Sequence, residues 1–141
     1  PNRLISCLGN MDQHPLPLKP CFMIYDVPFG VFHGTSIHPR GDIPKLKVVA
    51  KEMGVRILLT GHTHQTEVFV DDEHFIFNPG TATGASGGSH WTVDTAAMVL
   101  TLTQLADTGK VQLALVLYRI TPQGNLTSET RTFLLSSKKT P

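Results

Sequence analysis

The most constraining feature of this chain is an apolar run that ends directly in two histidines. Residues 55–60 read Val-Arg-Ile-Leu-Leu-Thr, and residues 61–64 follow without a gap as Gly-His-Thr-His. Such a run is typical of a buried strand, and open α/β sheets bind their ligands at the carboxyl ends of their strands. Because His62 and His64 are one side-chain period apart on extended backbone, both imidazoles can face one metal cluster. Taken by itself, this motif has an alternative interpretation, in which both histidines are polar loop residues that bind no metal.

Two other apolar runs end in a similar way. Residues 4–8 stop at Gly-Asn-Met-Asp, and residues 29–32 stop at His-Gly. A glycine beside each candidate ligand lets the backbone approach an ion closely. Together the three runs offer one carbonyl oxygen and three neutral imidazoles, those of Asn10, His33, His62 and His64. This mixed oxygen and nitrogen set suits zinc, manganese or iron better than calcium.

Residue spacing predicts two groups of strands. The first group is a hairpin at residues 21–25 and 27–32, followed by strands at 66–70 and 74–77. The second group, which no helix interrupts, lies at residues 96–105, 111–121 and 125–135. We therefore expect a mixed first sheet and an antiparallel second sheet of three strands. Residues 80–90, rich in Gly, Ser, Ala and Thr, are predicted to form a mobile loop or a lid.

One helix is predicted between the hairpin and the histidine motif. Asp42 can cap its amino end, Pro44 is tolerated in its first turn, and Gly54 stops it. Its apolar positions recur at helical spacing, at Ile43, Leu46, Val49, Ala50 and Met53.

Composition and charge are typical of one globular domain spanning residues 1–141. The hydrophobic content is 40%, and a chain of this size buries about two-thirds of its unfolded surface. A net charge of +1 and 16% charged residues leave no basic stripe for nucleic acid. No apolar stretch reaches the roughly 18 residues that a transmembrane segment needs. Two cysteines favour a reducing compartment over a disulfide scaffold.

The order and spacing of the motifs resemble the second half of the calcineurin-like metallophosphoesterase superfamily. These motifs are Gly-Asn-x-Asp at 9–12, His-Gly at 33–34, Gly-His-Thr-His at 61–64 and Asn-Pro-Gly at 78–80. Two stretches, 39–42 and 78–85, resemble a narrower family, the metallophosphoesterase-fold subunits of retromer, the endosomal sorting coat. The resemblance covers about residues 4–133 and implies an α/β fold, a four-layer αββα sandwich.

The motifs that open the superfamily have no counterpart here. Its members begin with a strand bearing Asp-x-His and a second strand ending in Gly-Asp, and nothing before Leu4 encodes them. A βαβ unit needs roughly 30 residues or more. Residues 92–141 contain neither motif, so the missing strands have not moved to the carboxyl end. We expect an N-terminally incomplete copy of the domain.

By match of motif, the resemblance implies a divalent metal, zinc or manganese. Asn10, His33 and His62 would bind the second of two ions, and His64 would complete the first, so that one site is nearly whole. The pocket or partner surface would include Asp12, Thr35, His38, Arg40 and Asn78. His38 stands where the retromer subunits present an apolar residue to regulatory partners.

Catalytic residues stay unassigned, because two positions depart from the phosphoesterase pattern. Met11 stands where many of these enzymes have a histidine that protonates the leaving group. Thr35 stands where the His-Gly-His motif has its second histidine. In the opposite direction, Asn10 is the enzyme-like residue where retromer subunits often carry Asp.

Two functions therefore stay open. The first is a retromer subunit for endosome-to-Golgi transport, cytoplasmic and peripheral on the endosome membrane, whose partners are the helical scaffold subunit and regulatory endosomal proteins. The second is a hydrolase that cleaves phosphodiesters with two metals. The narrower motifs and the missing second histidine favour the first.

Overall fold

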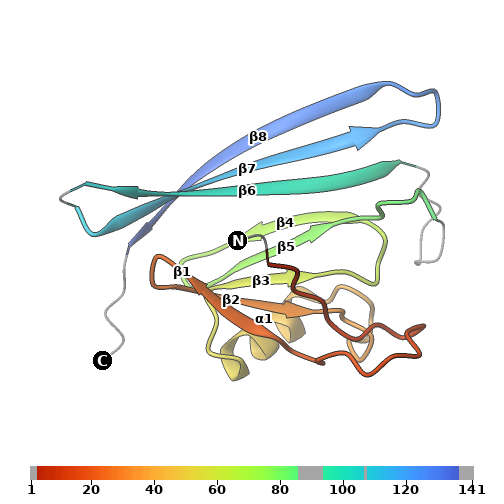
Figure 1. Ribbon diagram of the computed structural model, residues 1–141, viewed down its shortest axis with the longest axis horizontal. Helices are drawn as coiled ribbons and strands as arrows, with labels where there is room; N and C mark the ends of the chain where they lie inside the picture. Colours follow the sequence, from red (N-terminus) through yellow and green to blue (C-terminus); the bar gives the residue numbers. More distant parts are fainter. Residues whose placement is uncertain (1–2, 86–93, 107, 137–141) are drawn as a thin grey trace.

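The computed structural model describes residues 3–85, 94–106 and 108–136, and it contains two packed β-sheets (Figure 1). The first sheet has the strand order β1-β2-β3-β5-β4. Its strands are β1 Cys21–Ile24, β2 Val27–Phe32, β3 Ile57–Thr60, β4 Thr66–Val70 and β5 Phe75–Pro79. Strands β2, β3 and β5 pair in parallel, whereas β1 and β4 are antiparallel edges. The predicted mixed sheet is confirmed.

The second sheet is the predicted antiparallel meander. It consists of β6 Thr95–Leu105, β7 Lys110–Ile120 and β8 Leu126–Ser136, in that order. Helix α1, Ile43–Glu52, lies on the outer face of the first sheet, away from the second (Figure 1). The arrangement is the metallophosphoesterase-like fold that the sequence predicted, with three of the four expected layers, α1 and the two sheets, among the described residues. Within the described ranges, no helix covers the outer face of the second sheet, and none is long and apolar enough to cross a membrane.

The central strands are buried on both faces, which explains their continuous apolar sequence. Alternate side chains point to opposite sides of the sheet. Ile57, Phe75 and Phe77 face the second sheet and pack with residues such as Leu113. Leu58 and Ile76, together with Phe32, face α1 and pack with Leu46, Val49 and Ala50. The first sheet is therefore held rigidly between two apolar layers.

Helix α1 begins and ends where the sequence predicts. The Asp42 side chain accepts a hydrogen bond from the Lys45 backbone N–H at 2.9 Å, which caps the amino end. Gly54 has a φ of +66°, the left-handed conformation that glycine adopts easily after a helix. The Lys47 ammonium lies 2.6 Å from the Asp71 carboxylate, so the helix is also tied to the β4–β5 turn.

Several strand ends differ from the prediction by a residue or two, and one apolar run forms no strand. Residues 4–8, one of the three apolar runs, form no strand, and Leu4 is 94% exposed. A strand needs a neighbour to satisfy its backbone groups, and no described strand pairs with this segment. Strand β5 starts one residue later than predicted and continues through Asn78 and Pro79, because these residues pair with β4. Most of the predicted loop or lid, residues 86–90, lies outside the described residues.

The Lys47–Asp71 pair makes stability depend on pH. The hydrogen bond from Lys47 to the Asp71 carboxylate lowers the pKa of Asp71 from 3.8 to about 2, and the His74 backbone N–H adds to this effect. A carboxyl group whose pKa is lowered by folding stabilises the fold when the pH is above the ordinary pKa of the group. This contribution disappears as the pH falls through the lower pKa of the folded protein. We expect Asp71→Asn to lower the unfolding temperature at neutral pH, by an amount that shrinks from pH 4 toward pH 2. Thermal unfolding across this range checks it, and a difference independent of pH would contradict the account.

Candidate metal centre

Parallel pairing of β2 with β3 brings two of the predicted ligands together. Phe32 pairs with Thr60 at the carboxyl ends of the two strands, so the residues that follow begin side by side. The Gly61 backbone N–H donates to the His33 carbonyl at 3.2 Å. The ring centroids of His33 and His62 are 5.0 Å apart. The sheet thus places these two imidazoles in one location, as the motif pattern predicts.

The histidine loop, residues 61–64, does not have the extended backbone that the spacing suggested. His62 and His64 have φ values of +69° and +59°, in the left-handed region that side chains larger than glycine adopt uncommonly. A backbone hydrogen bond of 2.8 Å from the Thr63 N–H to the Gly61 carbonyl tightens the turn. Strain of this kind gathers at functional sites, where surrounding contacts hold it in place.

A hydrogen bond at Nδ1 holds two of the rings in place, and in His64 it leaves Nε2 available for a metal ion. His64 Nδ1 lies 2.8 Å from the Ala85 carbonyl oxygen. Because a carbonyl only accepts, Nδ1 carries the proton and Nε2 keeps its lone pair. His33 Nδ1 lies 2.6 Å from the Thr35 hydroxyl. Metal-binding histidines typically have such a partner on the other ring nitrogen. The position of Thr35 therefore indicates that it orients His33.

Burial favours the neutral form of the His33 and His62 rings. Burial lowers the pKa of His33, the Asp12 carboxylate opposes this effect, and His64 adds to it. Burial also lowers the pKa of His62, and the positive charge of Arg40 lowers it further. Since only a neutral imidazole binds a metal ion, these shifts favour coordination at neutral pH.

The turn at residues 9–12 supplies oxygen atoms beside His33. The Asp12 carboxylate accepts a hydrogen bond from the Gly9 N–H at 2.7 Å. A Cβ atom at Gly9 would lie 3.2 Å from Asp12 Oδ2 and 3.1 Å from the His33 ring, so a larger residue would press on both. Asn10 lies exposed on the same turn. Burial raises the pKa of the neighbouring Cys7 thiol, and Asp12 raises it further, so Cys7 stays protonated.

The donors fit a divalent ion in kind but do not enclose one. Among the described residues, no three His, Cys, Asp or Glu side chains lie close enough to hold a metal together. The Thr60 hydroxyl is buried without a hydrogen-bond partner, and a Cβ atom at Gly34 would lie 3.2 Å from it. The site therefore offers the neighbouring imidazoles of His33 and His62, the available Nε2 of His64, and the unsatisfied Thr60 hydroxyl.

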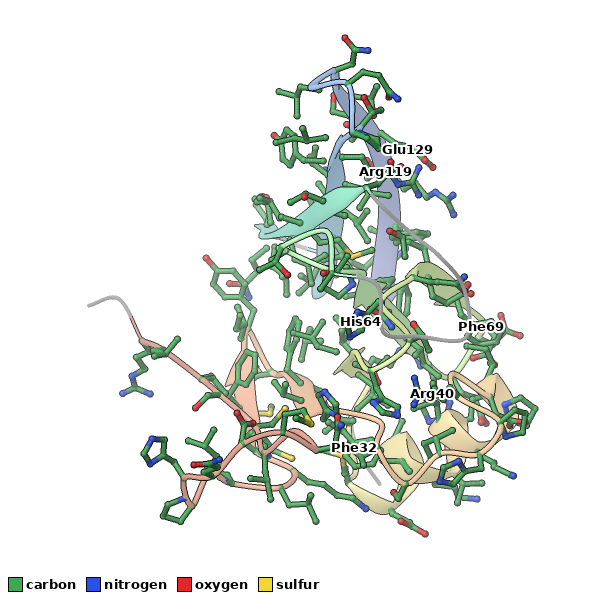
Figure 2. The ribbon with its side chains drawn as sticks, turned by 90° about the vertical axis from the view of Figure 1, so that its right-hand side faces the viewer. Phe32, Arg40, His64, Phe69, Arg119 and Glu129 are labelled. Carbon is green, nitrogen blue, oxygen red and sulfur yellow. The ribbon has the colours of Figure 1, made fainter. Side chains whose placement is uncertain are left out.

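The other predicted surface residues separate into two groups. His38 and Arg40 are exposed on the loop before α1, where the His38 carbonyl accepts a hydrogen bond from the Lys45 ammonium. In the view of Figure 2, Arg40 lies below His64. Asn78, predicted at the pocket or partner surface, is instead only 2% exposed. This burial excludes Asn78 from a partner surface but not from the pocket, because its amide is turned inward to the histidine loop.

A cavity of about 280 Å³ lies beside His64 and reaches the second sheet. Arg119 of β7 lines it together with Thr66, Thr81 and Asp94. In Figure 2, Arg119 lies on the side of His64 opposite Arg40. The sequence analysis missed Arg119 because it belongs to a regular strand distant in sequence, with no motif around it. A larger cavity of about 580 Å³ is lined mainly by the β1–β2 turn and the residues before β3.

The sequence of residues 2–103 matches the family model of the calcineurin-like phosphoesterase superfamily domain. The chain belongs to this superfamily. A probable metallophosphoesterase of Methanocaldococcus jannaschii is 43% identical over 83 residues, which are 57% of this chain and 42% of that protein. A second one, from Methanothermobacter thermautotrophicus, is 35% identical over 83 residues, or 56% of this chain and 48% of that protein. The chain therefore spans less than half the length of these relatives.

Solved structures of Vps29 share the fold. A single-mutant Vps29 from Entamoeba histolytica superposes with a TM-score of 0.80 at 27% identity, covering 92% of this chain and 68% of that one. Wild-type Vps29 from the same organism, complexed with zinc, has a TM-score of 0.78 at 25% identity with the same coverage. Vps29 from Cryptosporidium parvum has a TM-score of 0.75 at 27% identity, over 91% of this chain and 64% of that one.

The geometry predicts that zinc affinity depends on His62. We expect His62→Ala to weaken zinc binding by at least about tenfold, because it removes an imidazole beside His33. Isothermal titration calorimetry at neutral pH measures the effect. His14→Ala, at an exposed histidine in the loop before β1, is the matched control and should bind as the parent does. Equal affinities for parent and His62→Ala would remove His62 from the site.

Proposed function

We propose that the protein is a retromer-type subunit that uses the metallophosphoesterase fold as a scaffold for protein interactions in endosome-to-Golgi transport. The observation that carries this proposal is the similarity to Vps29 over about nine-tenths of the chain, with a TM-score of 0.80. The stretches at residues 39–42 and 78–85 support the same family. In this proposal, the endosomal location follows from the partners of the protein.

The candidate metal centre would have a structural role in such a subunit. Asn10, His33 and His62 would hold one zinc or manganese ion, and His64 would offer its free Nε2 to the same region. An ion at this position would add a positive charge and cross-link the loops that follow β2 and β3. A docking face held in this way loses less conformational freedom when a partner binds.

The proposed docking face lies around the metal centre and the loop before α1. His38 and Arg40 are exposed there, so both are accessible to a partner. The helical scaffold subunit of retromer is the proposed main partner, and regulatory endosomal proteins are further ones. An imidazole at position 38 is a weaker apolar anchor than an aliphatic side chain, because its ring nitrogens lose water on burial.

The alternative function is a two-metal phosphodiesterase. The names of the archaeal relatives, which are 43% and 35% identical to this chain, favour it, as does the enzyme-like Asn10. Two departures oppose it. Met11 offers no proton to a leaving group, and the Thr35 hydroxyl lies 2.6 Å from His33 Nδ1 in place of a further imidazole.

One pair of measurements separates the two functions. We expect the protein to co-purify with the helical scaffold of retromer, and His62→Ala to retain this binding because an interface is spread over many contacts. The double variant His38→Glu/Arg40→Glu should lose binding, whereas Leu134→Glu, on the second sheet at a residue 54% exposed, should not.

The matching assay is hydrolysis of a model phosphodiester with zinc or manganese present. We expect no turnover above that of the metal alone. Metal-dependent hydrolysis at ordinary enzyme rates, abolished by His64→Ala and unaccompanied by scaffold binding, would replace the proposed function with the alternative.

A further inference from the structure

Asn78 is buried at the carboxyl end of β5, directly behind the candidate metal centre. It is 2% exposed, and the strand that carries it pairs with β3, whose last residue precedes the histidine loop. A buried amide is costly unless its donors and its acceptor are all hydrogen-bonded. The bonds made by Asn78 therefore indicate what this side chain does.

We propose that Asn78 is a positioning residue that holds the histidine loop, residues 61–64, in its ligand-presenting conformation. Its Nδ2 group donates to the Gly61 carbonyl at 3.1 Å and to the Thr63 hydroxyl at 2.9 Å. Its Oδ1 atom accepts from the Gly80 N–H at 2.9 Å. The amide thus binds the loop at the residues before and after His62, and it is itself fixed by the start of the next segment.

The loop needs such support because its backbone is strained. His62 and His64 both have positive φ values. Non-glycine residues stay in this conformation only when surrounding contacts hold them there. Without the Asn78 bonds, the Gly61 carbonyl would lose a donor, and the loop could relax toward extended backbone. The His62 ring would then turn away from His33.

Thr63 carries the same constraint to a third segment. Its hydroxyl accepts from the Gln65 N–H at 3.1 Å while it also receives the Asn78 bond. Its methyl group lies where a Cβ atom at Gly41 would come within 2.8 Å. The loop before α1 therefore packs directly on Thr63, and Gly41, with φ of +75°, has no room for a side chain. Asn78, Thr63 and Gly41 form a chain of contacts from β5 to the exposed loop.

The role requires an amide. An ionised carboxylate at position 78 would have no hydrogen-bond donor. One carboxylate oxygen would then face the Gly61 carbonyl oxygen, and neither could donate to the other. The same carboxylate oxygen could only accept a hydrogen bond from the Thr63 hydroxyl. The substitution Asn78→Asp is therefore nearly isosteric while it removes both donated bonds. The zinc-affinity measurement below rests on the proposed metal centre. The measurement of the loop conformation does not, because it is made on metal-free protein.

The test combines zinc affinity with the conformation of the metal-free loop. We expect Asn78→Asp to weaken zinc binding about 10- to 100-fold, as removal of supporting groups around metal ligands typically does. Backbone amide resonances of residues 61–64 should shift in the metal-free variant. Thr63→Val, which removes only the hydroxyl, should have a similar but smaller effect. The double variant should lose less than the two single losses combined, because both substitutions remove the bond between Asn78 and Thr63.

Ile76→Val is the matched control, since Ile76 lies on the same strand, is fully buried and faces α1. It should lower thermal stability without changing zinc affinity or the loop resonances. If Asn78→Asp behaves like this control, the role of Asn78 is only structural and the proposal fails. If the parent binds no zinc, the metal centre fails, and the loop resonances alone decide the role of Asn78. If Asn78→Asp does not fold, the zinc affinity and loop resonances of Thr63→Val are compared with those of Ile76→Val in the same way.

Discussion

The parallel pairing of β2 with β3 is the constraint on which the candidate metal centre depends. It sets Phe32 opposite Thr60, and therefore starts the two ligand-bearing loops at the same edge of the sheet. A shift of one residue would move every side chain of a strand to the other face. The apolar layers on both sides of this sheet prevent such a shift. The rings of His33 and His62 thus approach each other because the core fixes the register.

Core packing does not by itself determine how the histidines face. That depends on polar contacts made after the strands end. The Thr35 hydroxyl and the Ala85 carbonyl occupy one nitrogen of His33 and of His64, respectively. Asn78 donates hydrogen bonds to Gly61 and Thr63, the residues on either side of His62. Either proposed function, scaffold or hydrolase, would use this arrangement, because an ion bound here would join loops that also form the exposed face.

The sequence was sufficient for the parts of the fold that rest on periodicity. Buried strands, the capped helix and the antiparallel meander all follow from side-chain patterns. The approach of His33 to His62 was predictable because parallel strands end at one edge. The left-handed backbone at His62 and the inward turn of Asn78 were not, since they depend on hydrogen bonds between segments distant in sequence. The same applies to Arg119, which reaches the cavity beside His64 only through sheet packing.

X-ray absorption spectroscopy at the zinc edge, on protein loaded with one equivalent of zinc, tests the account most directly. Because His33 and His62 are brought together with neutral rings, the account predicts at least two imidazole nitrogens at about 2.0–2.1 Å, completed by oxygen donors. The imidazole scattering should fall when either histidine is replaced by alanine. A sulfur ligand at about 2.3 Å, or a shell of oxygen atoms alone, would contradict it.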